Sequence, residues 1–194
     1  RPPELTRHGD SRPMNSERRY PDAASGPFEV PPIEFADRED REIEIRPYDG
    51  SDAEQEALVE MYSAFDPSDR AQGIPPGQES RIQTWLESIL SEDCLNVIAW
   101  DDGTAAGHST LVPDGDEDYE LAIFVLQDYQ EAGIGTHLIE SLLGHGASNG
   151  IKKVWLTVER WNHSAVSLYK KVGFETTGAE SFELEMAIRL GEDD

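Results

Sequence analysis

One segment near the middle of the chain restricts the fold more than any other. The apolar run Leu121 to Val125 is followed by glycines at positions 133 and 135 and by the amphipathic stretch Ile134 to Leu143. This order predicts a strand, a glycine turn and a helix. The first backbone N–H groups of a helix lack an intrahelical partner and lie at the positive end of the helix dipole. The junction therefore favours binding of a phosphate group.

Spacing separates this turn from two common phosphate loops. A Walker loop ends in Gly-Lys-Ser/Thr, whereas Thr136 follows Gly135 here. A dinucleotide fingerprint has a third glycine three residues after the second, where this chain has Leu138. The pattern that remains is Gln-x-x-Gly-x-Gly, from Gln130, in which Gly133 and Gly135 leave room for the backbone to approach a phosphate. An ordinary turn with two glycines is the alternative.

A second block of sequence supports the phosphate interpretation. The β-rich run Ile151 to Val158 follows Asn149-Gly150, a helix-stop signal. Residues 162–174 then read Asn-x-x-Ala-x-x-Leu-Tyr-x-x-x-Gly-Phe. Together, the two motifs resemble the coenzyme A pyrophosphate loop and the following signature of the GNAT family of N-acetyltransferases, in the order that the family uses. The resemblance covers roughly residues 42–190, and residues 122–174 carry its specific motifs.

The resemblance implies a binding mode for acetyl-CoA. In the family, two central strands separate and the pantetheine arm lies between them, so backbone groups of Ile123-Phe124-Val125 would pair with its amides. The pyrophosphate would be held by the N–H groups of Glu131, Ala132, Gly133, Ile134, Gly135 and Thr136. Gln130 replaces an arginine that is also common there, and its amide would bind a phosphate without adding charge. Asn162 would cap its helix, contact the pantetheine arm, or both.

The resemblance also proposes catalytic groups. Tyr169 matches the candidate acid of the family. Free tyrosine, with a pKa near 10, is a weaker acid than a thiol near 8.5, so full proton donation to the leaving thiolate is uphill by about 2 kcal/mol. We therefore expect Tyr169 to donate a hydrogen bond to the sulfur. A tyrosine that only packs its helix onto the sheet is the alternative.

The general base is predicted as Glu120, because many relatives keep a catalytic glutamate on this strand. Strand alternation, however, places Glu120 on the opposite face from Val125 unless a bulge intervenes. Glu159 and a water chain are alternative bases. Some relatives that acetylate protein N-termini carry a glutamate at the position of Thr157, and this departure weakens that choice of acceptor.

Composition narrows the class of protein. The net charge of -24 argues against a general nucleic-acid binder, which needs a basic face. Heavy acidity, scarce lysine and a single cysteine resemble the proteins of salt-loving archaea, and an acidic groove for cationic substrates is the alternative. No apolar run approaches the roughly 18 residues of a membrane span, the first residues lack a signal-peptide core, and Cys94 has no partner for an internal disulfide. A cytoplasmic enzyme is the expectation.

A metal cofactor is not predicted. Four histidines show no metal-ligand spacing with one another or with Cys94, and we expect them on the surface or on helix faces. They are His108, His137, His145 and His163.

The chain divides into a proline-rich tail over residues 1–41, predicted as disordered or loosely docked, a domain over residues 42–190, and an acidic end over residues 191–194. Periodicity in the domain predicts the element order βααβββαβαββ, an α/β fold with a mixed, mostly antiparallel sheet flanked by helices. Apolar residues of the tail at positions 28, 30, 33 and 35 would allow part of it to lie along the domain.

The resemblance predicts an N-acetyltransferase that transfers an acetyl group from acetyl-CoA to a primary amine of a protein or small molecule by direct attack in a ternary complex. The alternative is a catalytically silent CoA-binding regulatory module. In a third interpretation, the proline-rich tail recruits the partner that the domain modifies. Relatives commonly dimerise, so a homodimer is a further expectation.

Overall fold

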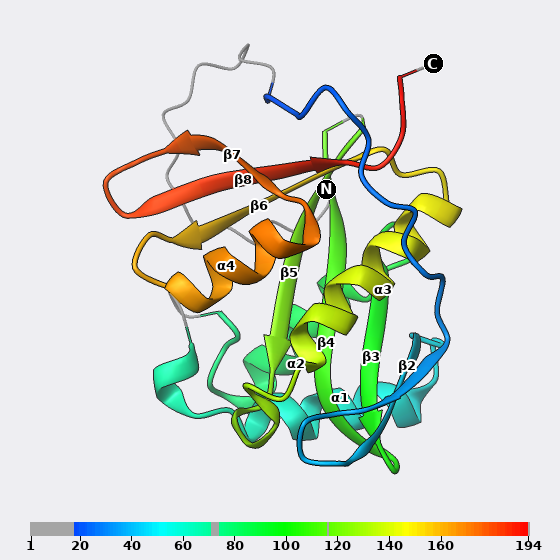
Figure 1. Ribbon diagram of the computed structural model, residues 1–194. Helices are drawn as coiled ribbons and strands as arrows, with labels where there is room; N and C mark the ends of the chain where they lie inside the picture. Colours follow the sequence, from blue (N-terminus) through cyan, green and yellow to red (C-terminus); the bar gives the residue numbers. More distant parts are fainter. Residues whose placement is uncertain (1–17, 71–73, 116, 194) are drawn as a thin grey trace.

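A twisted eight-stranded sheet organises the chain in the computed structural model, which describes residues 18–70, 74–115 and 117–193 (Figure 1). The strand order across the sheet is β1-β2-β3-β4-β5-β6-β8-β7, in which β5 and β6 are parallel and all other neighbours are antiparallel. The strands are β1 (Ile33–Ala36), β2 (Glu42–Pro47), β3 (Leu95–Asp101), β4 (Thr104–Asp114), β5 (Asp118–Val125), β6 (Lys153–Glu159), β7 (Glu175–Ala179) and β8 (Glu183–Arg189).

Helices cover both faces of the sheet. One face carries α1 (Asp52–Ser63) and α2 (Glu79–Ile89), and the other carries α3 (Ile134–Ser148) and α4 (His163–Val172) (Figure 1). Two short 3₁₀ helices, η1 (Pro67–Asp69) and η2 (Gln127–Tyr129), lie in the connections. This architecture confirms the predicted mixed, mostly antiparallel sheet flanked by helices.

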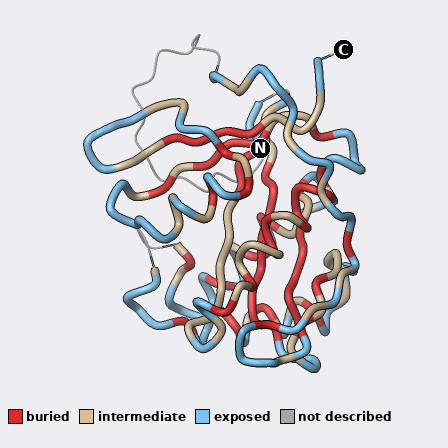
Figure 2. The backbone as a smooth tube through the Cα atoms, viewed as in Figure 1, coloured by how far each residue is buried: buried red, intermediate tan, exposed pale blue. Residues whose placement is uncertain are grey.

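The alternation of side chains along the strands divides the interior into two hydrophobic cores. On β5, Leu121, Ile123 and Val125 pack with α3 and α4, whereas Ala122 and Phe124 pack with α1 and α2. The register of β4 with β5 has no bulge, so this alternation is continuous from Asp118 to Val125. Figure 2 shows the buried backbone running along the central strands.

The parallel strands β5 and β6 pair only at their beginnings. Asp118 to Glu120 pair with Lys153 to Trp155, and beyond these three residue pairs the strands diverge (Figure 1). The rest of β5 is paired on one side only, with β4. The divergence leaves an open backbone edge inside the sheet and next to the predicted glycine turn.

Of the predicted tail, residues 18–41 lie along the domain, while residues 1–17 lie outside the described residues. β1 pairs with β2, and Phe28, Ile33 and Phe35 pack against the core under α3. The chain passes so close to α3 that a Cβ on Gly144 would overlap the carbonyl group of Glu29. The structural unit therefore begins before residue 42, because apolar side chains in a proline-rich segment are enough to anchor it.

His108 departs from the prediction that the histidines lie on the surface or on helix faces. It is fully buried on β4, where its Nδ1 accepts a hydrogen bond from the Tyr62 hydroxyl at 2.6 Å and its Nε2 donates to Asn96 Oδ1 at 2.7 Å. Asn96 in turn donates to the carbonyl of Ile89, which fixes the direction of the chain of hydrogen bonds. These partners compensate for the burial of a polar ring.

The described residues contain no group of three or more His, Cys, Asp and Glu side chains able to hold a metal ion. Nor, within the same residues, is any helix both long and apolar enough to cross a membrane.

Candidate functional site

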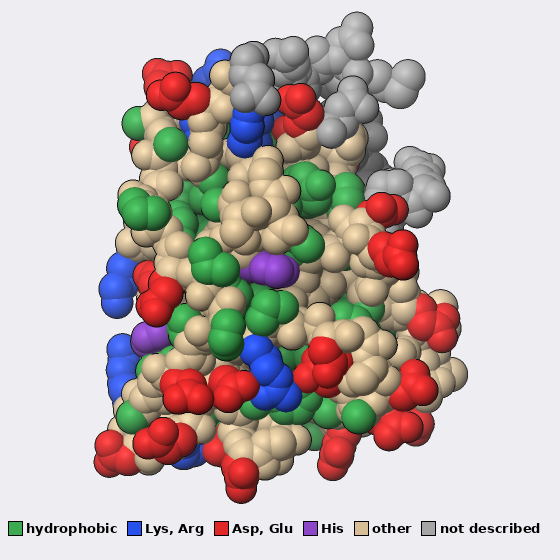
Figure 3. Space-filling view, turned by 90° about the vertical axis from the view of Figure 1, so that its right-hand side faces the viewer, with side chains coloured by type: hydrophobic (Ala, Val, Ile, Leu, Met, Phe, Trp, Pro, Cys, Tyr) green, Lys and Arg blue, Asp and Glu red, His purple; other side chains and the backbone are tan. Residues whose placement is uncertain are grey.

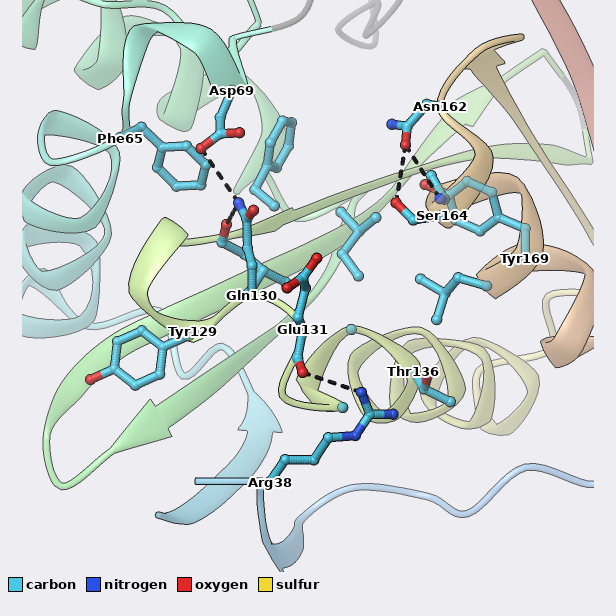
Figure 4. A pocket seen from close by; sticks show the side chains of 17 residues that line it. Arg38, Phe65, Asp69, Tyr129, Gln130, Glu131, Thr136, Asn162, Ser164 and Tyr169 are labelled. Carbon is cyan, nitrogen blue, oxygen red and sulfur yellow. Dashed lines mark hydrogen bonds between the residues drawn. The ribbon is translucent and has the colours of Figure 1, made fainter. Parts of the chain in front are cut away.

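A cleft of about 820 Å³ lies where β5 leaves β6 (Figure 4). Its walls come from the end of β5, the turn before α3, the start of α4 and the connection between α1 and α2. The lining residues are Arg38, Phe65, Asp69, Ile123, Phe124, Val125, Tyr129, Gln130, Glu131, Gly133, Gly135, Thr136, Asn162, Ser164, Ala165, Leu168 and Tyr169. Ten of the predicted site residues are among them. Ala132 and Ile134 are buried under the turn, and Glu120 lies elsewhere.

The open edge of β5 presents the backbone groups of Ile123 and Val125 to the cleft. The N–H of Leu126 donates to Ala106 on β4, and the carbonyl of Ala122 accepts from Ser109 on β4. Because hydrogen-bonding directions alternate along a strand, Ile123 and Val125 must point their N–H and C=O groups away from β4. An extended chain with amide groups fits such an edge as an additional strand would.

The turn before α3 leaves the start of the helix without a side-chain cap. Gly133 is the N-cap residue in the left-handed region, with φ 89°, and no side chain caps the helix. Glu131 also has a positive φ of 60°. The first helical N–H groups therefore have neither an intrahelical partner nor a side-chain cap. A Cβ on Gly135 would make only ordinary contacts, at 3.5 Å to Leu168, so the protein itself does not require glycine there.

Gln130 does not point its side chain at the turn. Its Nε2 donates to the carbonyl of Val125 at 2.9 Å and lies 3.5 Å from Asp69 Oδ2. The amide thus closes the end of β5 and links it to the α1–α2 connection. This arrangement differs from the predicted phosphate contact, because the nearby strand-end carbonyl takes the donor.

Arg38 was missed by the sequence analysis. It lies between β1 and β2, and its backbone N–H donates to the carbonyl of Ala132 at 3.1 Å while its Nη1 donates to the carbonyl of Glu131 at 3.2 Å. A guanidinium has five N–H donors, so others remain for a ligand. Arg38 both holds the turn and brings a positive charge to it, whereas Gln130 brings none (Figure 4).

The loop that carries Arg38 is itself fixed by Asp37. This buried carboxylate accepts hydrogen bonds from the backbone of Glu39 and Arg41, both at 2.9 Å, and from Arg41 Nε at 2.7 Å. Burial opposes ionisation, but these hydrogen bonds outweigh it and hold the pKa of Asp37 below its usual range. Aspartate favours such turns, because its side chain accepts hydrogen bonds from the backbone N–H groups that follow it.

Tyr169 and Asn162 lie across the cleft from Gln130 and Glu131 (Figure 4). Among the described residues, no group hydrogen-bonds the Tyr169 hydroxyl, and burial raises its pKa to about 12. Tyr129 also lines the cleft, but its hydroxyl already donates to Asp101 at 2.7 Å. Tyr169 is therefore the tyrosine whose proton is available to a ligand.

Asn162 caps α4 as predicted. Its Oδ1 accepts from the backbone N–H of Ala165 and from the hydroxyl of Ser164, each at 3.3 Å. Its side-chain NH₂ donates to no described residue. The cap and a ligand contact are thus compatible, because they use different atoms of one amide.

Aromatic side chains close the α1–α2 side of the cleft. Phe65 and Phe124 line it, and Tyr62 and Trp85 pack edge-on against Phe124 with ring centroids 5.5 and 5.4 Å away. Trp85 packs against the core and does not line the cleft. Phe65 is both a core residue and part of the cleft wall.

Glu120 lies on the face opposite Val125, as alternation predicted. It is buried beside Trp155, at the last residue pair before β5 and β6 separate, and it does not line the cleft. Glu159 and Thr157 lie on the same face of β6, outside the cleft lining. The structure thus brings the donor-side residues together and leaves the predicted bases at the far end of the gap.

Comparison with known proteins agrees with this geometry. Residues 56–174, more than half of the chain, match the Acetyltransferase (GNAT) family. An uncharacterized N-acetyltransferase of Mycobacterium tuberculosis is 33% identical over 84 residues, which are 43% of this chain and 54% of that protein. The [ribosomal protein bS18]-alanine N-acetyltransferase of Escherichia coli is 28% identical over 116 residues, covering 60% of this chain and 75% of that enzyme. The chain spans about half the length of the M. tuberculosis relative.

Solved structures share the fold. The GNAT domain of PAT from S. lividans has a TM-score of 0.69 at 15% identity and covers 81% of this chain and 96% of its own. The PaiA N-acetyltransferase of Thermoplasma acidophilum, solved with coenzyme A, has a TM-score of 0.60 at 24% identity, covering 76% and 98%. The chain belongs to the Acetyltransferase (GNAT) family.

Proposed function

We propose that this chain is an N-acetyltransferase that transfers an acetyl group from acetyl-CoA to a primary amine by direct attack in a ternary complex. The observation that carries the proposal is the continuity of one cleft, from the open edge at Ile123 and Val125 to the uncapped start of α3, with Tyr169 on its wall. The family match and the coenzyme A in a structural neighbour support it.

The donor would be held by backbone groups. Its pantetheine amides would pair with Ile123 and Val125, and its pyrophosphate would accept hydrogen bonds from the N–H groups of residues 131–136. Arg38 would add charge at the same turn, which a neutral Gln130 does not. Phosphate affinity would therefore depend on the helix start and on one arginine from the β1–β2 loop.

In the reaction, the amine nitrogen attacks the thioester carbon, a C–N bond forms, and the C–S bond breaks to release a thiolate. Tyr169 would donate a hydrogen bond to that sulfur. With a pKa of about 12, complete transfer of its proton to the thiolate, whose thiol has a pKa of 8.5, is uphill by about 5 kcal/mol. Stabilisation of developing negative charge is therefore its role, with solvent supplying the final proton.

The amine must lose a proton, and Glu120 remains our proposed base. It lies at the point where the strands part, so its carboxylate would act through water on an amine held in the gap. The alternative is a CoA-binding module without catalysis. It is favoured by the absence of Glu120 from the cleft, where Asp69 and Glu131 are the only described carboxylates in the lining.

We also propose that the acidic surface is an adaptation to high salt. Carboxylates are spread over the face shown in Figure 3, and the chain carries 40 acidic against 16 basic residues. At molar salt the Debye length falls to about 3 Å, which removes most of the resulting repulsion. A cytoplasmic location and a homodimer stay predictions of the sequence.

The experiment that tests the function is calorimetric titration of acetyl-CoA and free coenzyme A at molar KCl. We expect the parent to bind both, Gly133→Glu to lose binding, and Arg38→Ala to bind about fivefold more weakly. Arg81→Ala, on the exposed side of α2, is the matched control and should bind like the parent. Absence of binding by the parent would overturn the proposal. Binding without thiol release across an amine panel would favour the silent module.

A further inference from the structure

A second site lies on the sheet face opposite α3 and α4, and the chain's own Arg18 occupies it. The guanidinium Nη1 lies 2.9 Å from Glu185 Oε2, and Nη2 lies 3.1 Å from Asp114 Oδ2. Nε lies 4.0 Å from Asp118 Oδ2, and Cζ lies 3.4 Å above the centre of the Trp155 ring. One guanidinium is thus stacked on an indole and surrounded by three carboxylates.

The site is largely buried and is not a group of surface charges. The side chain of Arg18 is 16% exposed and that of Glu185 is 10% exposed, while Trp155 is 5% exposed. A planar cation stacked on an aromatic face, with carboxylates at its edge, is the arrangement that selects guanidinium over other groups. Asp114, at 48% exposure, marks the side that opens to solvent.

The site adjoins the gap where the acetyl group would be transferred. Trp155 is the last residue of β6 paired with β5, and Thr157 is paired with Glu185 on β8. Thr157 follows Trp155 on the same face by two residues, or about 7 Å along the strand. Under the proposed function, the donor occupies the other face of the gap, which carries α3 and α4. An acceptor therefore has to enter from the face that carries Arg18.

On this basis we propose that the Arg18 site is a subsite for the acceptor, and that it takes an arginine side chain of a basic peptide segment next to the amine that is acetylated. The inference rests on the proposed acetyltransferase function and names its acceptor class. Arg18 then acts as a competing occupant that must leave before the acceptor binds.

A peptide acceptor is favoured over a free polyamine because the present occupant is itself a peptide. The segment after Arg18 runs across β8, where the carbonyl of Pro21 accepts from Arg189 Nε at 2.7 Å and the N–H of Ser25 donates to the carbonyl of Arg189 at 2.8 Å. The site thus already accommodates an arginine together with the extended chain that carries it.

Arg46 provides a matched control. Its guanidinium also bonds two carboxylates, Glu44 at 2.8 Å and Glu54 at 3.1 Å, and lies 4.7 Å from the Trp100 ring. Arg46 belongs to β2, which lies beyond β3 and β4 from the gap. Its loss would remove a similar set of contacts without opening the proposed subsite.

The test measures binding and acetylation of two amine-bearing peptides that differ only in one residue, arginine or its neutral analogue citrulline. We expect Arg18→Ala to bind the arginine peptide about three- to tenfold more tightly, because the subsite no longer has to be vacated. Glu185→Gln should raise KM for the arginine peptide about tenfold and leave KM for the citrulline peptide unchanged. Asp118→Asn should change the two KM values in the same direction as Glu185→Gln. The test then does not depend on the correct folding of a single variant.

Three outcomes would overturn the inference: equal behaviour of Arg18→Ala and Arg46→Ala, equal effects of Glu185→Gln on both peptides, and preference of the parent for spermidine over either peptide. Peptide binding is measured by calorimetry without acetyl-CoA, so its result does not depend on catalysis. Acetyl-CoA binding with thiol release on any amine, but without discrimination between the peptides, would contradict the subsite and leave the proposed function intact.

Discussion

Tyr169 is the single side chain on which the proposed chemistry depends most. Its hydroxyl faces the cleft, and its neighbour Phe174 packs edge-on at 5.8 Å between ring centroids, which fixes the ring. Because burial raises the pKa of Tyr169 to about 12, the group stays protonated through the whole physiological range. It can therefore serve as a donor throughout that range.

We expect Tyr169→Phe to lower kcat by about two orders of magnitude, the usual contribution of a positioned proton donor, with KM for acetyl-CoA nearly unchanged. Thiol release under saturating acetyl-CoA measures this. Tyr129→Phe is the control, since its hydroxyl is already engaged by Asp101. An unchanged rate for Tyr169→Phe would remove the catalytic assignment and leave a tyrosine that packs α4 on the sheet.

His108 gives the fold a pH dependence. Burial lowers its pKa to about 3, below the ordinary value of 6.5. The unfolded chain therefore binds a proton below about pH 6.5 that the folded protein does not, so this contribution is complete above pH 6.5 and is lost as the pH falls towards 3. Between pH 6.5 and 4.5 the loss amounts to about 2 kcal/mol.

Urea unfolding of the parent and of His108→Gln between pH 7 and 4.5, in molar KCl, measures the contribution of His108 to the pH dependence of the unfolding free energy. A glutamine still donates to Asn96 and accepts from Tyr62. The carboxylates titrate alike in both proteins, so the difference in unfolding free energy should shrink steadily with falling pH. A constant difference would show that His108 is not held neutral by the fold.

At the scale of the elements, the two glycines of the turn before α3 differ in what the backbone requires of them. Gly133 has φ 89°, where a side chain costs about 1–2 kcal/mol, whereas Gly135 lies within the helix and tolerates a Cβ. We expect Gly133→Ala to destabilise the protein by that amount. Gly135→Ala should be neutral or stabilising by up to about 1 kcal/mol, because alanine favours a helix over glycine.

The same pair of variants reports on the ligand. If the backbone at Gly135 must approach a phosphate, Gly135→Ala will weaken acetyl-CoA binding without loss of stability, as measured by calorimetry and urea unfolding together. Equal affinity of Gly135→Ala and the parent would place the pyrophosphate further from the helix axis. Gly133→Ala should lose stability and affinity together, and so serves as the comparison.

How far the sequence predicted these elements depends on the range of the contacts involved. The glycine turn, the cap at Asn162 and the alternation of Glu120 with Val125 follow from local patterns, and the structure has them. Arg38 and Arg18 were not predicted, because their partners lie 93 and up to 167 residues away in the chain. A proline-rich segment with few apolar residues gives no local signal of where it will dock.

His108 shows a different limit. It was predicted on the surface or on a helix face, yet it is buried on β4, and its stabilising partners Tyr62 and Asn96 come from α1 and β3. Metal-ligand spacing in the sequence does not report on such a hydrogen-bond network. Gln130 is the converse case: family position suggested a phosphate contact, and the nearest unpaired carbonyl took its donor instead.

At the scale of the whole molecule, the charge of -24 should make stability depend strongly on salt. We expect the urea midpoint to rise between 0.1 and 2 M KCl, as the Debye length falls from about 10 Å to below 3 Å. Exposed Glu56 and Glu60 lie in an acidic groove between α1 and α2. Neutralising both with glutamine should stabilise the protein in dilute buffer and have little effect in molar KCl. A midpoint independent of salt would contradict the proposed adaptation.

The three residue pairs between β5 and β6 have a mechanical consequence. They join two parts of the sheet, β1 to β5 and β6 to β8. The Arg18 site takes Asp114 and Asp118 from the first part, and Glu185 and Trp155 from the second. A cation bound at this site therefore contacts both parts of the sheet and links them. If acetyl-CoA affinity also depends on the angle between these two parts, acceptor and acetyl-CoA must change each other's affinity by the same factor.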